Sequence, residues 1–417
     1  MVTNNISQEL FIARQPIFDG KLRIYGYELL FRDADMESAN VTNGEVATSK
    51  VIIDGFSLAQ KGIPKKTYFF INFPYKSLIS GIAEILPKET TVIEILEDVI
   101  IDRDILRACI DLKKKGYLLA LDDFIGHVTN KKLFKLIDIV KIDIINMEIE
   151  TIEKLILLVK NLNPTIKILV EKVEDRKIFN ITKKMGADLF QGYFFQKPEL
   201  VKGKSIPPTT ITKLKLLAFF SKKNISDNLD ELENIIKTDL SLSYKLLKYI
   251  NSPAIGLANK IKKIRQAINL LGYNNVVKWC RIFLLSTINP SDRGIEIIRQ
   301  STIRGYFLTG LIDFIKTDHT EDELFMLGLF SLLDALLDQS MEDILALLPL
   351  DDTIKDTLLG KKTPLYPYLK LIEKQERGDW KGVLNLLKEL KMPLDLVSSV
   401  YANALGETDK LFKANSN

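Results

Sequence analysis

Leu118–Phe124, which reads Leu-Leu-Ala-Leu-Asp-Asp-Phe, decides the fold of the first half of the chain. Its four leading apolar residues are typical of a buried strand, and two adjacent carboxylates follow where that strand ends. Buried carboxylates require positive charge beside them. The alternative is a polar loop or a helix N-cap after a core strand, but the same arrangement recurs along the chain.

Apolar runs of strand length alternate with helical patterns from residue 9 to about residue 195. Gly116 and Gly186 stand where two of the helices should end. This alternation predicts parallel βα units and hence a (β/α) barrel, with an open doubly wound sheet as the alternative. The expected strands are 10–18, 22–31, 67–73, 91–96, 117–123, 138–144, 166–173 and 187–193, and the expected helices include 43–62, 102–115, 150–161 and 175–185.

The composition excludes several classes of protein. The 417 residues are 46% hydrophobic and 27% charged, which predicts a globular chain of two domains. Apolar runs of membrane-spanning length and a secretory leader are both missing from the sequence, so we expect a cytoplasmic protein without a membrane partner. The net charge of +4 is too small to indicate a nucleic-acid partner.

Cysteine and histidine are scarce. Cys109 and Cys280 lie far apart in expected amphipathic helices, which favours core positions over a disulfide or a metal site. The two histidines, His127 and His319, are too few for a zinc enzyme, a Ser-His-Asp hydrolase or a metal-binding His-Asp phosphohydrolase. Carboxylates would therefore have to hold any metal, which favours Mg²⁺ or Mn²⁺.

Polar residues stand at the C-terminal ends of nearly all the expected strands. In a barrel these ends meet at one rim and form the active site. Carboxylates converging on one rim repel one another unless cations lie between them, so the sequence predicts a site for one or two divalent ions. The strand-end residues are Glu28, Asn72, Glu94, Asp122, Asp123, Lys141, Asp143, Glu171 and Gln191.

These motifs resemble the EAL family of barrel phosphodiesterases, which open the bacterial second messenger cyclic di-GMP to linear pGpG. The resemblance covers about half of the chain. The family motif corresponds to Glu28-Leu29-Leu30-Phe31-Arg32, preceded by Gln15-Pro16-Ile17. The other matching residues are Asn72, the glutamates Glu94 and Glu97, Asp122 with Asp123, Lys141 with Asp143, Glu171 with Glu174, and Gln191-Gly192-Tyr193.

The resemblance implies a role for each of these residues. Glu28, Asn72, Glu94 and Asp122 should hold one metal, and Asp122, Asp123 and Glu171 the second. Lys141 and Gln191 should orient the hydrolytic water, so Glu28, Lys141, Glu171 and Gln191 form the implied catalytic set. Lys141 would be either a base or a counter-ion for the barrel carboxylates. The implied substrate contacts are Gln15, Leu30, Arg32 and Asp143, and the supporting residues are Glu97 and Glu174.

The chain also departs from the family. After its aspartate pair the family usually has Phe-Gly-Thr-Gly and then serines, a loop that supports metal binding and dimerisation. Here the loop begins Phe124-Ile125-Gly126-His127, and Leu96 replaces the usual threonine. We expect His127 to be an exposed loop residue rather than a pocket residue. Altered support of this kind can cost orders of magnitude in activity with every ligand present.

The second half of the sequence is entirely helical after a proline-rich junction at 197–210. We therefore expect a barrel domain at 1–204 and a helical domain at 205–417. The latter resembles the HDOD domain, a relative of His-Asp phosphohydrolases, but Ser331 and Leu332 occupy the His-Asp positions. A basic patch at 260–265 is expected to be a solvated helix face, the alternative being nucleotide or acidic-partner binding. The expected helices are 209–222, 228–237, 241–251, 262–271, 273–288, 293–316, 321–338 and 340–348, with more after Pro367 and Pro393.

Two functions remain open at this stage. The leading hypothesis is a metal-dependent cyclic di-GMP phosphodiesterase whose HDOD domain is regulatory and binds a protein partner. The alternative is a catalytically silent cyclic di-GMP sensor or scaffold. EAL domains often pair, so a homodimer is a further expectation, although the usual pairing loop is altered here. A sugar-phosphate enzyme on an unrelated barrel would require the whole motif series to be coincidental.

Overall fold

The structure is a computed structural model of the chain. It describes residues 10–33, 66–96, 99–127, 131–192, 229–252 and 260–415, together with the single positions 56, 60, 63, 210, 213, 214, 217, 255 and 257. The side chains at 10–12, 31–33, 240, 241 and 413–415 are not described. Most of the helix expected at 43–62 lies outside these residues. The domain boundary expected at 204/205 lies wholly outside them.

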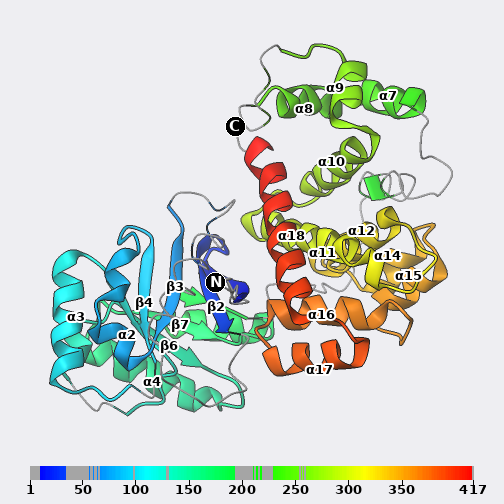
Figure 1. Cartoon of the computed structure of the whole chain (residues 1–417). Helices are drawn as coiled ribbons and strands as arrows, with labels where there is room; N and C mark the ends of the chain where they lie inside the picture. The colour runs from blue at the N-terminus through cyan, green and yellow to red at the C-terminus, as the bar shows by residue number, and fades with distance from the viewer. Residues whose placement is uncertain are drawn as a thin grey trace, which may run out of the picture. The chain divides into compact units, whose positions relative to one another are not determined.

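Eight strands close into a barrel in sequential order (Figure 1). The alternation of apolar runs therefore gave the correct architecture, and the open doubly wound sheet is excluded. The strands are β1 Leu10–Asp19, β2 Ile24–Asp33, β3 Tyr68–Phe73, β4 Thr91–Ile95, β5 Leu118–Leu121, β6 Ile139–Asp143, β7 Lys167–Glu171 and β8 Leu189–Phe190.

The first strand departs from the expected parallel units. β1 pairs antiparallel with both β2 and β8, whereas the other neighbouring strands are parallel. Only the short turn at 20–23 joins β1 to β2, and Asp19 Oδ1 accepts hydrogen bonds there from the N–H groups of Lys21 and Arg23. A parallel pair needs a crossover of about a dozen residues, so this hairpin can only be antiparallel. The expectation of parallel units throughout is wrong at β1.

Helices pack on the outside of the parallel strands. Asp102 caps α3 by accepting hydrogen bonds from two backbone N–H groups, and Gly116 ends it with φ +95°. The apolar faces of α3 and α4 join the strand residues in one core that includes the buried thiol of Cys109. The helices and 3₁₀ turns are α2 Tyr75–Ile79, η1 Ile82–Ile85, α3 Arg103–Lys115, η2 Leu133–Lys135, α4 Ile149–Leu162 and α5 Arg176–Lys184.

Alternation along each strand divides the core into two layers. On β4, Val92 lies inside the barrel, Ile93 packs outward against the helices, and Glu94 points inward again, nearer the strand end. The interior layer fills the barrel below this level with Ile17, Phe70, Val92, Ala120, Ile139, Leu169 and Leu189. We call the end above this layer, where the parallel strands finish, the barrel mouth.

The remaining described elements are helical, as expected (Figure 1). The helix expected at 321–338 is broken at Ser331 and Leu332, where Leu332 leaves helical geometry with φ −129° and ψ 22°. The helices are α7 Leu229–Thr238, α8 Leu240–Ile250, α9 Ile264–Leu271, α10 Tyr273–Ser286, α11 Asp292–Gly310, α12 Glu321–Phe330, α13 Leu333–Leu337, α14 Met341–Ala346, α15 Asp352–Leu358, α16 Tyr366–Glu376, α17 Trp380–Leu390 and α18 Leu394–Asn415, with a 3₁₀ turn η4 at Ile312–Phe314.

The helical core forms around α11 and α12. An added Cβ at Gly328 would lie 2.3 Å from the backbone nitrogen of Gly305, so the two helices approach each other as closely as only glycine permits. Cys280 is buried in the same core without a disulfide partner. The basic patch at 260–265 is not the solvated helix face that was expected. Lys260, Lys262 and Lys263 are exposed but precede α9, and Arg265 is half-buried and pairs with Asp230 and Glu233.

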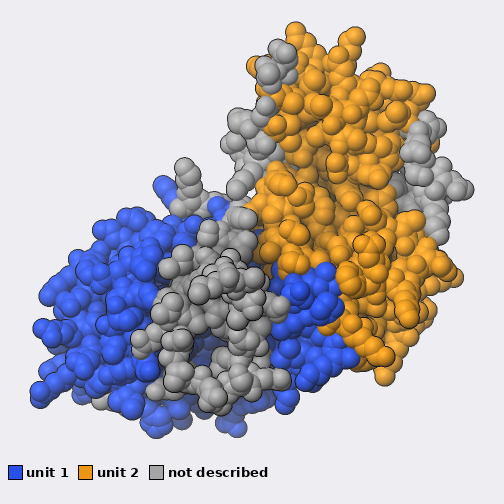
Figure 2. Space-filling model, in the orientation of Figure 1, with its two compact units in different colours: residues 1–196, 373–388, 393–398 blue, residues 197–372, 389–392, 399–417 orange. Residues whose placement is uncertain are grey.

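The chain forms two compact units (Figure 2). Unit 1 comprises residues 1–196, 373–388 and 393–398, and unit 2 comprises 197–372, 389–392 and 399–417. The turn between α16 and α17 thus belongs to the barrel unit, although it follows the helical region in sequence. Within the part of the chain that the structure describes, the helices are all too short or too polar to cross a membrane.

Candidate active site

The ammonium of Lys141 lies at the centre of the barrel mouth. Its Nζ is 2.8 Å from Glu94 Oε1, 2.9 Å from both Glu28 Oε1 and Asp122 Oδ1, and 3.0 Å from Glu171 Oε1. All five residues are buried, with 9% or less of their surface exposed. Burial acts to lower the pKa of Lys141, but the surrounding carboxylates raise it well above its ordinary value. Lys141 is therefore a protonated counter-ion at the centre of an acidic ring.

Strand register brings this ring together. Residues of the interior layer are followed two positions later by polar residues, and a period of two places both on the inside of the barrel. In the parallel ladders Asn72 pairs with Glu94, and Asp143 pairs with Glu171. Residues separated by more than 140 positions thus share one level of the barrel, as the polar strand ends indicated.

Two amide side chains fix Glu28. Gln191 Nε2 donates to Glu28 Oε2 at 2.6 Å and lies 2.9 Å from Gln15 Oε1, while Lys141 donates to Glu28 Oε1 at 2.9 Å. Gln191 follows β8 and Gln15 lies on β1, so the antiparallel strand contributes to the site. Both carboxylate oxygens of Glu28 are therefore held by defined donors.

Burial and mutual repulsion set the protonation of the carboxyls. Burial acts to raise the pKa of Glu28, but Lys141 and the hydrogen bond from Gln191 outweigh it and hold that pKa below its usual range. Burial raises the pKa of Glu94 well above its ordinary value, raises that of Glu171 to about 8, and raises that of Asp122, with Lys141 offsetting only part of the effect. One ammonium is too little positive charge for the whole ring.

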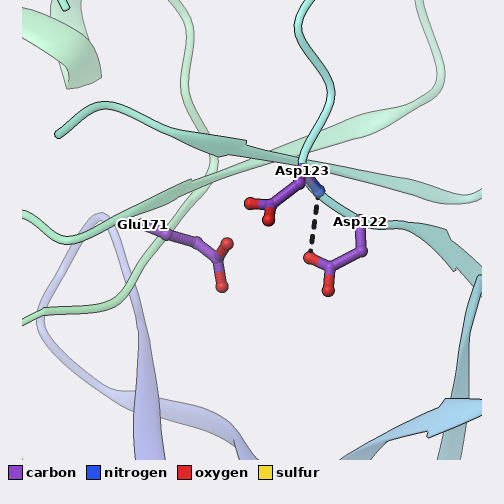
Figure 3. A group of neighbouring side chains, drawn as sticks. All are labelled: Asp122, Asp123 and Glu171. Atoms are coloured by element: carbon purple, nitrogen blue, oxygen red, sulfur yellow. Dashed lines mark hydrogen bonds between the residues drawn. The ribbon is translucent and has the colours of Figure 1, made fainter. Parts of the chain in front are cut away.

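Two carboxylates of the ring, together with the neighbouring Asp123, suit a metal ion (Figure 3). Asp122, Asp123 and Glu171 each offer an oxygen within 4.8 Å of the others. Asp123 adopts φ 42°, in the left-handed region that non-glycine residues rarely enter, and its N–H donates to Asp122 Oδ1 at 3.1 Å. Strained backbone of this kind is typical of functional sites.

Orphaned acceptors complete the case for cations. Asn72 Oδ1 is buried without a hydrogen-bond donor. Glu94 Oε1 lies close to Lys141, yet neither oxygen of Glu94 accepts a well-directed hydrogen bond. Such groups are costly in a folded protein unless something satisfies them, and a carboxylate and amide oxygen set is the donor set of hard divalent ions. The residues present therefore fit a divalent metal centre.

A second charged pair lies at the rim. Asp143 accepts a hydrogen bond from the N–H of Ile145 at 2.8 Å and forms an ion pair with Lys172. The hydrogen bond to Asp143 raises the pKa of Lys172, whose backbone is left-handed with φ 55°. The sequence analysis did not single out Lys172, although it directly follows Glu171 and lies between the matching residues Glu171 and Glu174.

The other predicted residues lie farther out. Leu30 is half-buried and lines the mouth cavity, a space of about 330 Å³ above the acidic ring. Glu174 is exposed and lines a neighbouring cavity with Gln15. The Arg32 side chain and residue Glu97 lie outside the described part of the chain, so their roles stay predictions.

A larger, mainly apolar cavity adjoins the carboxylates of Asp122 and Asp123. It measures about 710 Å³, and Asp122 and Asp123 form part of its wall. His127 is exposed, as expected of a loop residue, and also lines this cavity. The altered loop after Asp123 is therefore a wall of this space. Its apolar lining includes Leu96, Ile100, Phe124, Ile125, Ile145 and Met147.

The helical unit has a different arrangement at the His-Asp positions. Arg304 donates a hydrogen bond to Ser331 Oγ at 3.0 Å. Burial raises the pKa of nearby Asp334 to about 6, an effect that Arg304 partly offsets. His319 has an acidic neighbour, with Nδ1 3.6 Å from Glu323 Oε2. Among the described residues, a group of three acidic, histidine or cysteine side chains close enough to share one metal ion occurs only in the barrel, at Asp122, Asp123 and Glu171.

Comparison with known proteins identifies two domain families in successive parts of the chain. The EAL domain family matches residues 72–198, and the HDOD domain family matches residues 206–342. The chain is 36% identical to Bacillus subtilis (strain 168) YuxH over 384 residues, covering 89% of this chain and 91% of that protein. It is 33% identical to the Vibrio cholerae cyclic di-GMP phosphodiesterase CdgJ over 387 residues, covering 92% of this chain and 89% of that protein.

Among solved structures, the Klebsiella pneumoniae BlrP1 complex with manganese and cyclic di-GMP aligns with 46% of this chain and 56% of its own, at 20% identity and a TM-score of 0.38. The two full-length relatives carry the assignment, because each exceeds 30% identity over most of both chains. The chain belongs to the family of bacterial two-domain proteins that join an EAL domain to an HDOD domain.

Proposed function

We propose that this protein is a divalent-metal-dependent phosphodiesterase that hydrolyses cyclic di-GMP to pGpG. The acidic ring at the barrel mouth is the observation that carries the proposal, because its carboxylates converge within ion-pair distance of one ammonium and leave acceptors unsatisfied. In the reaction, water oxygen bonds to one phosphorus, the bond from phosphorus to the 3′ oxygen breaks, and that oxygen takes a proton. The product is linear and carries a terminal phosphate.

Two overlapping groups would hold the cations, Mg²⁺ or Mn²⁺. Glu28, Asn72, Glu94 and Asp122 form one group, and Asp122, Asp123 and Glu171 form the other. Bound there, divalent ions would lower the pKa of a water and neutralise charge on the phosphoryl oxygens. This donor set contains only oxygen, which favours these two ions over zinc.

The chain's own residues orient Glu28 and neutralise negative charge in the site. Lys141 is held protonated by the ring, which favours its counter-ion role over its role as a base in the metal-free protein. Gln191 and Gln15 fix the direction of Glu28. Lys172 and Asp143 form the rim pair nearest the ring, where an ammonium can meet a phosphate oxygen.

The ligand matches the two cavities. Cyclic di-GMP combines two anionic phosphodiesters with two flat guanine bases. The mouth cavity is polar and cation-rimmed, and the adjoining space of about 710 Å³ is mainly apolar and suits a planar base. The altered loop at 124–127 forms one of its walls, so it would contact a base placed there.

Turnover tests the proposal directly. The full-length protein is incubated with cyclic di-GMP and MnCl₂ or MgCl₂, and pGpG is separated by liquid chromatography. We expect the wild-type protein to produce pGpG. Glu28→Ala should lower the rate by about a thousandfold or more, because the metal would lose a ligand and Lys141 would lose an ion-pair partner. Glu153→Ala, at an exposed position on α4, is the matched control and should behave as wild type.

Binding without turnover would favour the silent-sensor alternative, for which the altered loop is the supporting observation. Isothermal titration with cyclic di-GMP, run beside the activity assay, separates the two functions. A protein that neither binds nor hydrolyses the dinucleotide would contradict both of these functions and would favour the scaffold alternative.

The remaining expectations extend the proposal. The helical domain, predicted at 205–417, is proposed to be regulatory and to bind a protein partner. A homodimer and a cytoplasmic location are proposed with it; the unpaired buried thiols of Cys109 and Cys280 suit a reducing compartment. Size-exclusion chromatography with light scattering tests the dimer.

A further inference from the structure

The turn between α16 and α17 forms a wall of the mouth cavity. Arg377 and Gly378 line this space together with Glu28, Asp122 and Lys141. Gln15 Nε2 donates to the backbone carbonyl of Glu376 at 3.4 Å, a long hydrogen bond that joins positions 361 apart in sequence. All these residues belong to unit 1, so the wall and the acidic ring lie in one compact unit.

Contact at this turn is close. An added Cβ at Gly378 would lie 2.7 Å from Leu30 Cδ1, and Gly378 itself has φ +68°. The backbone angle favours glycine at this position, and any side chain there would force Leu30 to shift. Leu30 is one of the residues that the family resemblance assigns to substrate binding.

Hydrogen bonds hold the turn in shape. Lys374 Nζ donates to Asp379 Oδ2 at 2.6 Å, and the N–H of Gly382 donates to Asp379 Oδ1 at 2.9 Å. The N–H of Trp380 donates to the carbonyl of Gly378 at 2.8 Å. A turn fixed at both ends presents Arg377, whose side chain is exposed, at a defined place on the cavity wall.

The charge of the cavity floor indicates which part of the ligand Arg377 would contact. The floor of the cavity is acidic and suits the cations that act on the reacting phosphodiester. A cyclic dinucleotide carries a second phosphodiester that stays intact, and its charge also needs a partner. A guanidinium offers a planar pair of donors that matches two phosphate oxygens.

We propose that Arg377 binds the non-reacting phosphate of cyclic di-GMP, so that a residue from the C-terminal helical region completes the barrel site. The inference rests on the proposed function and adds to it a ligand contact for which the sequence motifs give no indication. It also supplies a route for regulation, because movement of the α16–α17 turn would change ligand affinity.

Paired substrates test the inference. The variants are Arg377→Ala, Arg377→Lys and Lys381→Ala, the last an exposed control on α17 outside the cavity lining. With cyclic di-GMP, Arg377→Ala should raise KM and the titration Kd about tenfold with kcat within about twofold of wild type, and Arg377→Lys should recover part of the affinity. With bis(p-nitrophenyl) phosphate, which has a single phosphodiester, Arg377→Ala should leave kcat/KM unchanged.

The outcomes separate this inference from the proposed function. The inference would be overturned if Arg377→Ala had unchanged KM and Kd for cyclic di-GMP, or bound it more tightly. The proposed function would still stand in that case, provided that the wild-type protein turns over cyclic di-GMP. An equal loss with both substrates would also overturn it, since the residue would then act on the shape of the site. A wild-type protein that ignores cyclic di-GMP but cleaves the small diester removes the proposed function, and the inference with it.

Discussion

The two units bury charge in opposite ways. In the barrel mouth several carboxylates converge on the single ammonium of Lys141, and acceptors on Asn72 and Glu94 stay unsatisfied. In the helical unit the buried arginines are spread out, each near a separate acceptor. The distances there are 3.4 Å for Arg281–Asp322, 3.2 Å for Arg293–Asp338, 3.6 Å for Arg299–Asp409 and 3.0 Å for Arg304–Ser331.

This difference separates a ligand site from an architectural one. Converging acids are unstable without added cations, so their placement is explained by what they bind. Arg281, Arg293 and Arg299 each have a carboxylate beside them, so no excess of one sign builds up at one place, and these pairs are explained by the helices they connect. Arg304 makes the contrast sharpest, because it supplies a cation beside the positions where catalytic relatives of the HDOD domain carry His-Asp.

Removal of the central ammonium is expected to have the largest effect. Lys141→Met leaves Glu28 and its neighbours buried without a cation, which should destabilise the metal-free barrel by about 3–5 kcal/mol. Divalent ions bound by the same carboxylates should restore part of the loss. The measurement is the melting temperature with EDTA and with MnCl₂, beside wild type.

Lys154→Met, at an exposed position on α4, is the control and should not respond. A Lys141→Met protein that melts like wild type in EDTA would show that the ring does not depend on this ammonium. A lowered melting temperature that MnCl₂ does not raise would contradict the assignment of the ring as a metal site.

The converging carboxylates could be predicted from sequence. The contributions of Lys172 and of the α16–α17 turn to the mouth cavity could not. Strand period and strand ends place Glu94, Asp122 and Glu171 on one face by local rules alone. Lys172 lies one residue beyond its strand, where a left-handed backbone redirects the chain, so alternation no longer gives its direction. The α16–α17 turn reaches the mouth only through tertiary packing, and neither spacing nor motif links Gln15 to a residue 361 positions away.

The fold-level errors have other causes. The expectation for β1 assumed parallel units, although the four-residue connection to β2 already required a hairpin. The break at Ser331 and Leu332 in the helix expected at 321–338 could not be placed from periodicity, because the residues on either side of it, 324–330 and 332–333, form a buried, almost continuous apolar run.

A smaller effect is expected from one dispersed pair in the helical unit. Asp409→Ala removes one of two carboxylates beside the buried Arg299 guanidinium, which keeps Glu296 Oε2 at 3.7 Å and the Phe412 ring, and should cost up to about 3 kcal/mol. Phosphodiesterase activity below the unfolding transition should not change. The measurement is urea denaturation followed by tryptophan fluorescence. The chain has 2 tryptophans, so in a Trp380→Phe background the signal comes from Trp279 alone and reports on the helical unit.

Glu407→Ala, at an exposed position on the same helix, serves as its control. A loss of turnover by Asp409→Ala in the folded state would erase the contrast between the two units, since a dispersed pair would then contribute to the ligand site.

The smallest effect depends on pH and concerns Asp334. Burial raises its pKa from the ordinary 3.8 to about 6. The folded state therefore binds this proton more tightly than the unfolded state, and the stability of the helical unit should fall as pH rises from about 4 to 6. Asp334→Asn removes that dependence, so the variant should match wild type near pH 4 and exceed it by about 1–3 kcal/mol at pH 7. Urea midpoints from the Trp279 signal across this pH range measure the difference. If wild-type stability instead rises through the same window, Arg304 holds Asp334 ionised, and the helical unit keeps a working ion pair beside the missing His-Asp positions.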